Sequence, residues 1–102
     1  MPSFDIAPNH LKIVHEILNL NLPSFSKVCV FGSRSQKAQK KYSDLDLAID
    51  YNGQKIPTTT LIALREAFDE SDLPYKVDIV DWNTLSDRFK QSIQVNRILL
   101  RG

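Results

Sequence analysis

Hydrophobic and polar residues recur along the chain with two different periods, one typical of helices and one typical of strands. Apolar residues three or four positions apart indicate helices that pack one face on a core. Short apolar runs, and runs in which every second residue is apolar, indicate strands. On this basis we predict helices over residues 9–20, 58–73 and 85–93, and strands over residues 27–31, 44–50 and 77–80.

Turn-forming residues fall between these elements. Pro8 suits the first turn of the first helix, and Pro23 ends that helix. Asn52 and Gly53 predict a turn after the second strand. The apolar residues 98–100 are interpreted as either a closing edge strand or a docked tail.

Helices and strands alternate throughout, which predicts an α/β fold with a small mixed β-sheet packed with helices. The length of 102 residues fits one domain spanning residues 1–102, with no internal repeat and no linker. Because a chain of this size buries only a limited core, we expect an exposed apolar patch that a partner covers.

Composition and charge argue against broad nucleic-acid binding, secretion and membrane insertion. Thirteen basic and twelve acidic residues give a net charge of +1, which supplies no broad cationic surface for nucleic acid. Cys29 is the only cysteine and lies in an apolar run, so we expect an inert core thiol and no disulfide. The N-terminal sequence lacks the pattern of a signal peptide, and no apolar stretch is long enough to cross a bilayer. We therefore expect a cytoplasmic protein.

Three aspartates carry the clearest chemical signal. Asp44 and Asp46 are two positions apart on a predicted strand, so their carboxylates leave one face, roughly 6.5–7 Å apart along the strand. Carboxylates this close repel each other unless a cation lies between them. Asp78, on the following predicted strand, supplies a third acid. Such oxygen ligands suit Mg²⁺ or Mn²⁺ and fit a two-metal site.

A phosphate-binding turn is predicted just before these acids. Gly32 and Ser33 follow a strand and precede a polar, helix-compatible segment, where glycine allows close backbone approach and free N–H groups attract an anion. Arg34 is placed for a further phosphate contact. Each feature alone also fits an ordinary turn or a solvent-facing strand; their order, each at the end of a predicted strand, favours function. Asp50 is left out of the site, and Asp81 is expected to cap the following turn.

Together these motifs resemble the signature of the DNA polymerase β-like nucleotidyltransferase superfamily. Within it, the segments at residues 30–34 and 41–49 resemble the minimal nucleotidyltransferase group. The resemblance implies a minimal polymerase β-like fold in which Gly32 and Ser33 bind triphosphate. It further implies that Asp44 and Asp46 bind both metals and that Asp78 binds the catalytic metal. The chain departs from the group at residues 35–37, where Ser-Gln-Lys replaces the usual Ala-Arg-Gly.

The resemblance also implies a function. Members of the minimal group resemble antitoxins that transfer AMP to an all-helical HEPN-domain partner, so we expect a Mg²⁺-dependent enzyme using ATP or another nucleoside triphosphate. The intact aspartates favour this interpretation. The altered residues 35–37 favour an alternative, a binding module that neutralises the HEPN partner by contact. Transfer to a small molecule is a third, weaker interpretation, because the chain carries no acceptor-binding domain.

Overall fold

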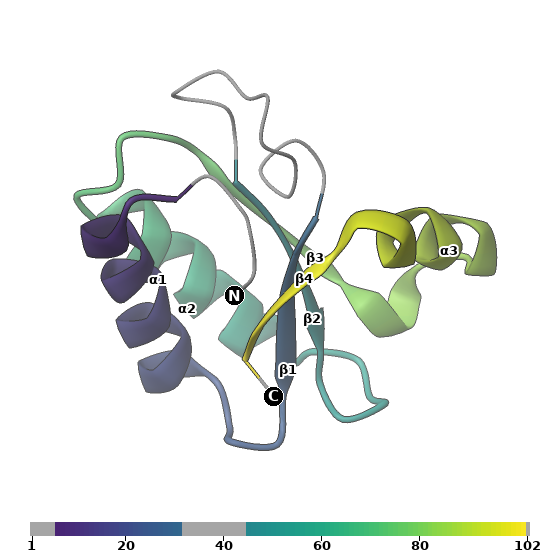
Figure 1. The fold of residues 1–102 in the computed structure, drawn as a ribbon. Coiled ribbons are helices and arrows are strands. Elements are labelled where there is room, and N and C mark those ends of the chain that lie inside the picture. Colours follow the sequence, from purple (N-terminus) through teal and green to yellow (C-terminus); the bar gives the residue numbers. More distant parts are fainter. Residues whose placement is uncertain (1–5, 32–44, 102) are drawn as a thin grey trace.

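The computed structural model describes residues 6–31 and 45–101. These residues form two long helices, a four-stranded sheet and a third helix that stands apart from the other two (Figure 1). The helices are α1 (Pro8–Asn21), α2 (Thr58–Asp69) and α3 (Asp87–Asn96), and the strands are β1 (Lys27–Phe31), β2 (Leu45–Asp50), β3 (Val77–Asp81) and β4 (Ile98–Arg101). A short 3-10 turn, η2 (Trp82–Thr84), joins β3 to the segment before α3.

The sheet is mixed, with strand order β3-β2-β1-β4. β1 pairs with β2 and with β4 in antiparallel fashion, whereas β2 and β3 run parallel. The α/β fold with a small mixed sheet is therefore confirmed. Residues 98–100 belong to an edge strand rather than to a docked tail, which settles the two interpretations of the chain's end.

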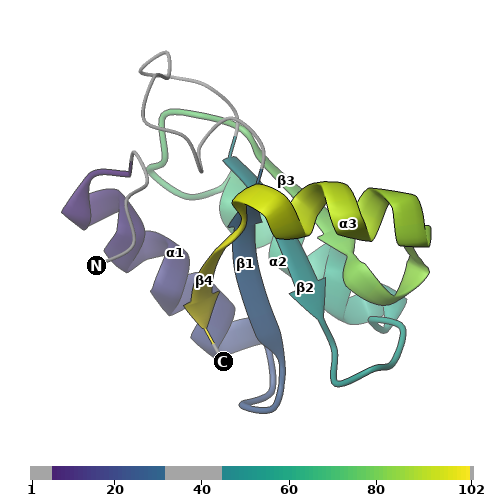
Figure 2. The same ribbon diagram turned by 45° about the vertical axis from the view of Figure 1, so that its right-hand side comes forward.

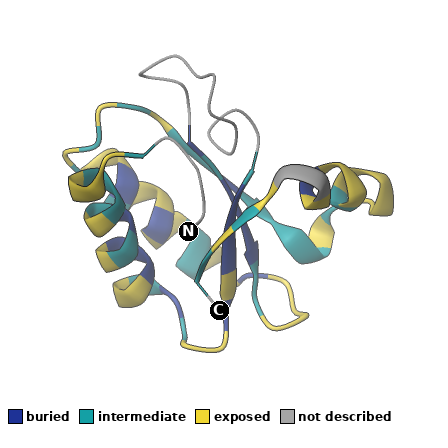
Figure 3. Cartoon of the chain, in the orientation of Figure 1, coloured by how far each residue is buried: buried dark blue, intermediate teal, exposed yellow. Residues whose placement is uncertain are grey.

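The main core lies between one face of the sheet and the helices α1 and α2, which cover that face together (Figures 1 and 3). Alternate residues of β1 and β2 point into this core, as the period of the sequence predicts. Both helices contribute a buried stripe, Val14, Ile17 and Leu18 from α1 and Leu64 and Phe68 from α2. The predicted core-facing helices are confirmed, and no described helix is long and apolar enough to span a membrane.

The opposite face of the sheet is covered only in part, by α3 (Figure 2). Ile93 of α3 is buried against Cys29 of β1 and Ala48 of β2. The remaining described side chains of α3 are exposed or half-buried, as Figure 3 shows. Cys29 is a buried free thiol, as expected, and burial raises its pKa above the ordinary value of 9.0.

The last helix differs from the prediction at its start. Leu85 lies before α3, after the turn η2, and therefore does not share a helical face with Phe89 and Ile93. Ser86 is the N-cap, and its hydroxyl oxygen accepts a hydrogen bond from the Phe89 N–H. The four-residue spacing suggested one apolar helical face. In the structure Leu85 and Ser86 form the connection between η2 and α3, and the helix begins only at Asp87. Phe89 is 45% exposed, whereas Ile93 of the same helix is buried.

Candidate active site

The structure brings Asp46 and Asp78 side by side. The two residues are register partners in the parallel pair β2–β3, so their side chains leave the same face of the sheet from adjacent strands, about 4.8 Å apart at the backbone. This face carries α3, because the neighbours Leu45 and Leu47 point into the core under α1 and α2. Both aspartates are half-buried. Two hard oxygen donors thus stand together, as a divalent cation requires.

Asp78 also faces a basic environment at the free edge of the sheet. The Lys76 ammonium lies 3.5 Å from its carboxylate, with the lysine side chain 70% exposed. Arg65 of α2 lines the same hollow of about 320 Å³, together with Asp69, Lys76 and Asp78. Sequence reasoning missed Lys76. The signal was its position two residues before Asp78, the same-face spacing already used for Asp44 and Asp46.

Four predicted site residues lie outside the described residues: Gly32, Ser33, Arg34 and Asp44. The described chain stops at Phe31 and resumes at Leu45, next to the register pair Phe31–Asp46. Within residues 6–31 and 45–101, no cluster of three or more metal-ligating side chains is present. The described part of the site therefore offers two carboxylates, and a third ligand from Asp44 stays a prediction.

The two aspartates left out of the site serve the fold. Asp81 accepts a hydrogen bond from the Asn83 N–H at the start of η2, which confirms the predicted cap, and another from the Ile56 N–H. Asp50 accepts hydrogen bonds from the Gly53 N–H and the Asn83 amide, both at 2.9 Å. These contacts close the turn after β2 and join it to η2.

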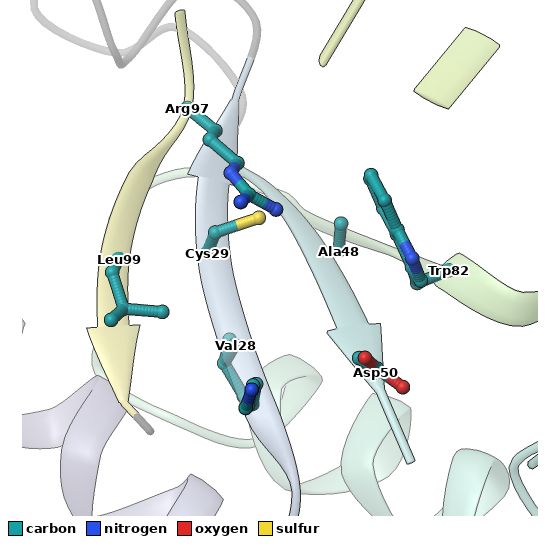
Figure 4. Close-up of a pocket in the computed structure, with 8 residues that line it drawn as sticks. Val28, Cys29, Ala48, Asp50, Trp82, Arg97 and Leu99 are labelled. Carbon is teal, nitrogen blue, oxygen red and sulfur yellow. The ribbon is translucent and has the colours of Figure 1, made fainter. Parts of the chain in front are cut away.

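A second hollow, of about 210 Å³, lies farther along the same face (Figure 4). Cys29 and Ala48 line it from the sheet, and Arg97 and Trp82 extend over it from either side. The Trp82 ring is already engaged, with the Lys90 ammonium 5.5 Å and the Arg97 guanidinium 5.6 Å from its centroid. Neither Asp46 nor Asp78 lines this hollow. It is therefore distinct from the paired carboxylates.

The chain is similar to known proteins in sequence and in fold. The chain is 44% identical over 90 residues to a probable protein adenylyltransferase, MntA of Haemophilus influenzae, covering 88% of this chain and 77% of that protein. A chain of a toxin–antitoxin crystal structure with AMP-PNP matches with a TM-score of 0.74 and 26% identity, covering 90% of this chain and 73% of that chain.

A second solved structure shows the same fold. It is a tri-AMPylated Shewanella oneidensis HEPN toxin in complex with an MNT antitoxin, with a TM-score of 0.67, 22% identity and coverage of 90% of this chain and 69% of that chain. Residues 12–101 match the family described as polymerase beta, nucleotidyltransferase, from within α1 to the end of β4. The chain therefore belongs to the polymerase beta nucleotidyltransferase family.

Proposed function

We propose that this chain transfers AMP from ATP to a hydroxyl group of a HEPN-domain protein and thereby acts as its antitoxin. The observation that carries the proposal is the register pair Asp46–Asp78, in a chain 44% identical to a probable protein adenylyltransferase. The similar solved structures described above hold AMP-PNP in one case and an AMPylated HEPN toxin in the other.

The carboxylates fit Mg²⁺ or Mn²⁺. Hard oxygen donors on adjacent strands match the preference of both ions, and Asp44 is the proposed third donor. A bound divalent ion would neutralise triphosphate charge and increase the acidity of the attacking hydroxyl. Such a cation would compete with the Lys76 ammonium for the Asp78 carboxylate.

The remaining roles belong to the chain's own residues. Asp46 lies centrally in the proposed site, with Phe31 on one side and Asp78 on the other. Asp78 lies on the edge strand β3. Its proposed role is to orient the acceptor hydroxyl for in-line attack on the α-phosphorus. Gly32, Ser33 and Arg34 are the proposed contacts for the β- and γ-phosphates, which leave as pyrophosphate.

The test uses the complete chain with its HEPN partner, ATP and Mg²⁺. Intact-mass spectrometry of the partner should show added AMP units, each bringing about one negative charge. Asp78→Asn keeps the side chain's shape but removes a metal-binding charge, so it should bind the partner and lose transfer. Asp72→Asn, at an exposed position before β3, is the matched control and should transfer normally.

The same experiment separates the enzyme from a neutralising binding module, which the altered residues 35–37 favour. A module would leave the partner's mass unchanged and would still neutralise the partner when it carries Asp78→Asn. An enzyme requires that mass increase and neutralisation are lost together in Asp78→Asn. The proposed function is wrong if the wild-type chain adds no mass while neutralising fully.

A further inference from the structure

Two aromatic side chains border the aspartate pair on the side away from β3. Phe31 ends β1 and is the register partner of Asp46, with about 5 Å between the two backbones. The ring of Phe89, from α3, meets the Phe31 ring edge to face, with 6.3 Å between centroids and 81° between planes. Asp78, Asp46 and Phe31 thus follow one another on adjacent strands of the sheet, and Phe89 packs on Phe31.

Phe89 differs from the neighbouring aromatic residue Trp82. The Trp82 ring lies under two cations and packs on the cluster around Ile93. Phe89 is half-exposed, and its ring meets the Phe31 ring edge to face. A single exposed phenylalanine is ordinary on a protein surface. This one is 45% exposed and contacts Phe31, the register partner of Asp46.

We infer that the exposed ring of Phe89, supported by Phe31, stacks on the base of the nucleotide whose α-phosphate is held at Asp46 and Asp78. The inference rests on the proposed function and deepens it by assigning a positioning residue for the nucleotide. Stacking on an aromatic ring is a general way to hold a base and tolerates different bases. Ser86 accepts a hydrogen bond from the Phe89 N–H and so fixes the backbone at the start of α3, from which the ring extends.

The position favours the nucleotide base over an aromatic ring of the acceptor. A ribose separates the base from the α-phosphate. If the acceptor hydroxyl belonged to a phenol, its ring would carry the attacking oxygen directly and would therefore lie closer to the α-phosphate. Phe31 lies one strand spacing from Asp46, and the Phe89 ring lies beyond Phe31. This separation suits the base, which is farther from the α-phosphate than the ring of the acceptor would be. The acceptor has its own access, because the hollow at the free edge of β3 is lined by Asp78.

The experiment compares two probes by calorimetry, Mg²⁺-ATP and Mg²⁺-tripolyphosphate, which has phosphates but no base. Phe89→Ala should weaken ATP binding about tenfold and leave tripolyphosphate binding unchanged. Phe89→Tyr keeps the ring and should retain the ATP affinity. The matched control is Phe25→Ala, because Phe25 is 49% exposed and pairs edge to face with Tyr51 at the opposite end of β1 and β2.

Each outcome decides the inference. It is overturned if Phe89→Ala binds ATP like the wild type, if both probes weaken equally, or if ATP binding is unchanged while the KM for the partner protein rises. Wild-type chain that binds neither probe would contradict the proposed function itself. Selective loss of ATP binding in Phe89→Ala, retained in Phe89→Tyr and in Phe25→Ala, supports base stacking at this residue.

Discussion

The Lys76 ammonium lies 3.5 Å from the Asp78 carboxylate, at the edge of the proposed metal site. Both groups are solvent-accessible, so this ion pair adds less than about 1 kcal/mol to stability. Its stronger effect concerns metal binding, because a divalent cation must share or displace the contact with Lys76. The resting ion pair therefore competes with the metal for Asp78.

We expect Lys76→Ala to raise the affinity for Mn²⁺ in the absence of nucleotide, by about two- to fivefold for a surface charge of this kind. Titration followed by electron paramagnetic resonance measures free Mn²⁺ directly. Lys55→Ala removes an exposed lysine outside the hollow beside Asp78 and should leave the affinity unchanged. A lower Mn²⁺ affinity in Lys76→Ala would show that Lys76 supports the site instead.

The double variant Asp44→Ala/Asp46→Ala should lose Mg²⁺-ATP binding. The variant lacks two of the three proposed carboxylate ligands. It should remain folded, because removing two negative charges relieves the repulsion between neighbouring carboxylates. Calorimetry with Mg²⁺-ATP measures the loss, and far-UV circular dichroism checks the fold. The control Asp72→Ala/Asp87→Ala removes two exposed aspartates of the described chain elsewhere. Equal ATP affinity in the two double variants would disprove the metal assignment.

The sequence predicted the layers of this fold well, for a physical reason. Each strand of the sheet is short and apolar on the core side, so its period appears directly in the sequence, as in β2. The start of α3 was predicted less well. Its apolar residues pack on only part of a sheet face, and a four-residue spacing cannot show that Leu85 belongs to the preceding turn.

The pairing of Asp46 with Asp78 could be anticipated from the sequence, but the residues around the two carboxylates could not. The spacing of Asp44 and Asp46 is local, and the sequence places Asp78 on another strand. The parallel register that brings Asp78 beside Asp46 comes from the structure. The approach of Phe89 to Phe31 depends instead on where α3 crosses the sheet, across 58 positions of sequence that carry no periodic signal for the contact. Long-range contacts of single side chains require the tertiary structure.

Acid should weaken the folded chain partly through Asp50. Burial acts to raise the pKa of Asp50, but hydrogen bonds from Gly53 and Asn83, with nearby Lys27 and Lys90, lower it below 3.8. The stabilisation is thus complete above about pH 4 and is lost as the pH falls through the lower folded-state pKa. Urea unfolding from pH 7 to 2 should show the wild type more stable than Asp50→Asn at pH 7, with the difference shrinking below pH 4. A difference independent of pH would contradict this assignment.

Arg101 should stabilise the fold by closing the end of α1. Its guanidinium donates to the carbonyl oxygens of Leu18, Leu22 and Pro23, at 3.3, 3.3 and 2.7 Å, where the last turn of α1 has no basic residue of its own. The Leu18 carbonyl also accepts the Leu22 N–H, and the Pro23 carbonyl accepts from Ser26, so the guanidinium adds donors to carbonyls that are already engaged. A cation beside the C-terminal end of a helix is favourable. We expect Arg101→Ala to lower the free energy of unfolding by about 2 kcal/mol in urea at pH 7.

Arg101→Lys tests the geometry of this contact, because an ammonium keeps the charge but cannot spread its donors over three carbonyls in the same fork. It should recover part of the loss. Arg88→Ala, at an exposed position on α3, controls for the removal of one positive charge. If Arg101→Ala and Arg88→Ala have the same urea midpoint, the contact between Arg101 and the end of α1 does not stabilise the fold. A midpoint lowered only in Arg101→Ala, and partly restored in Arg101→Lys, establishes the contact as the link between β4 and α1.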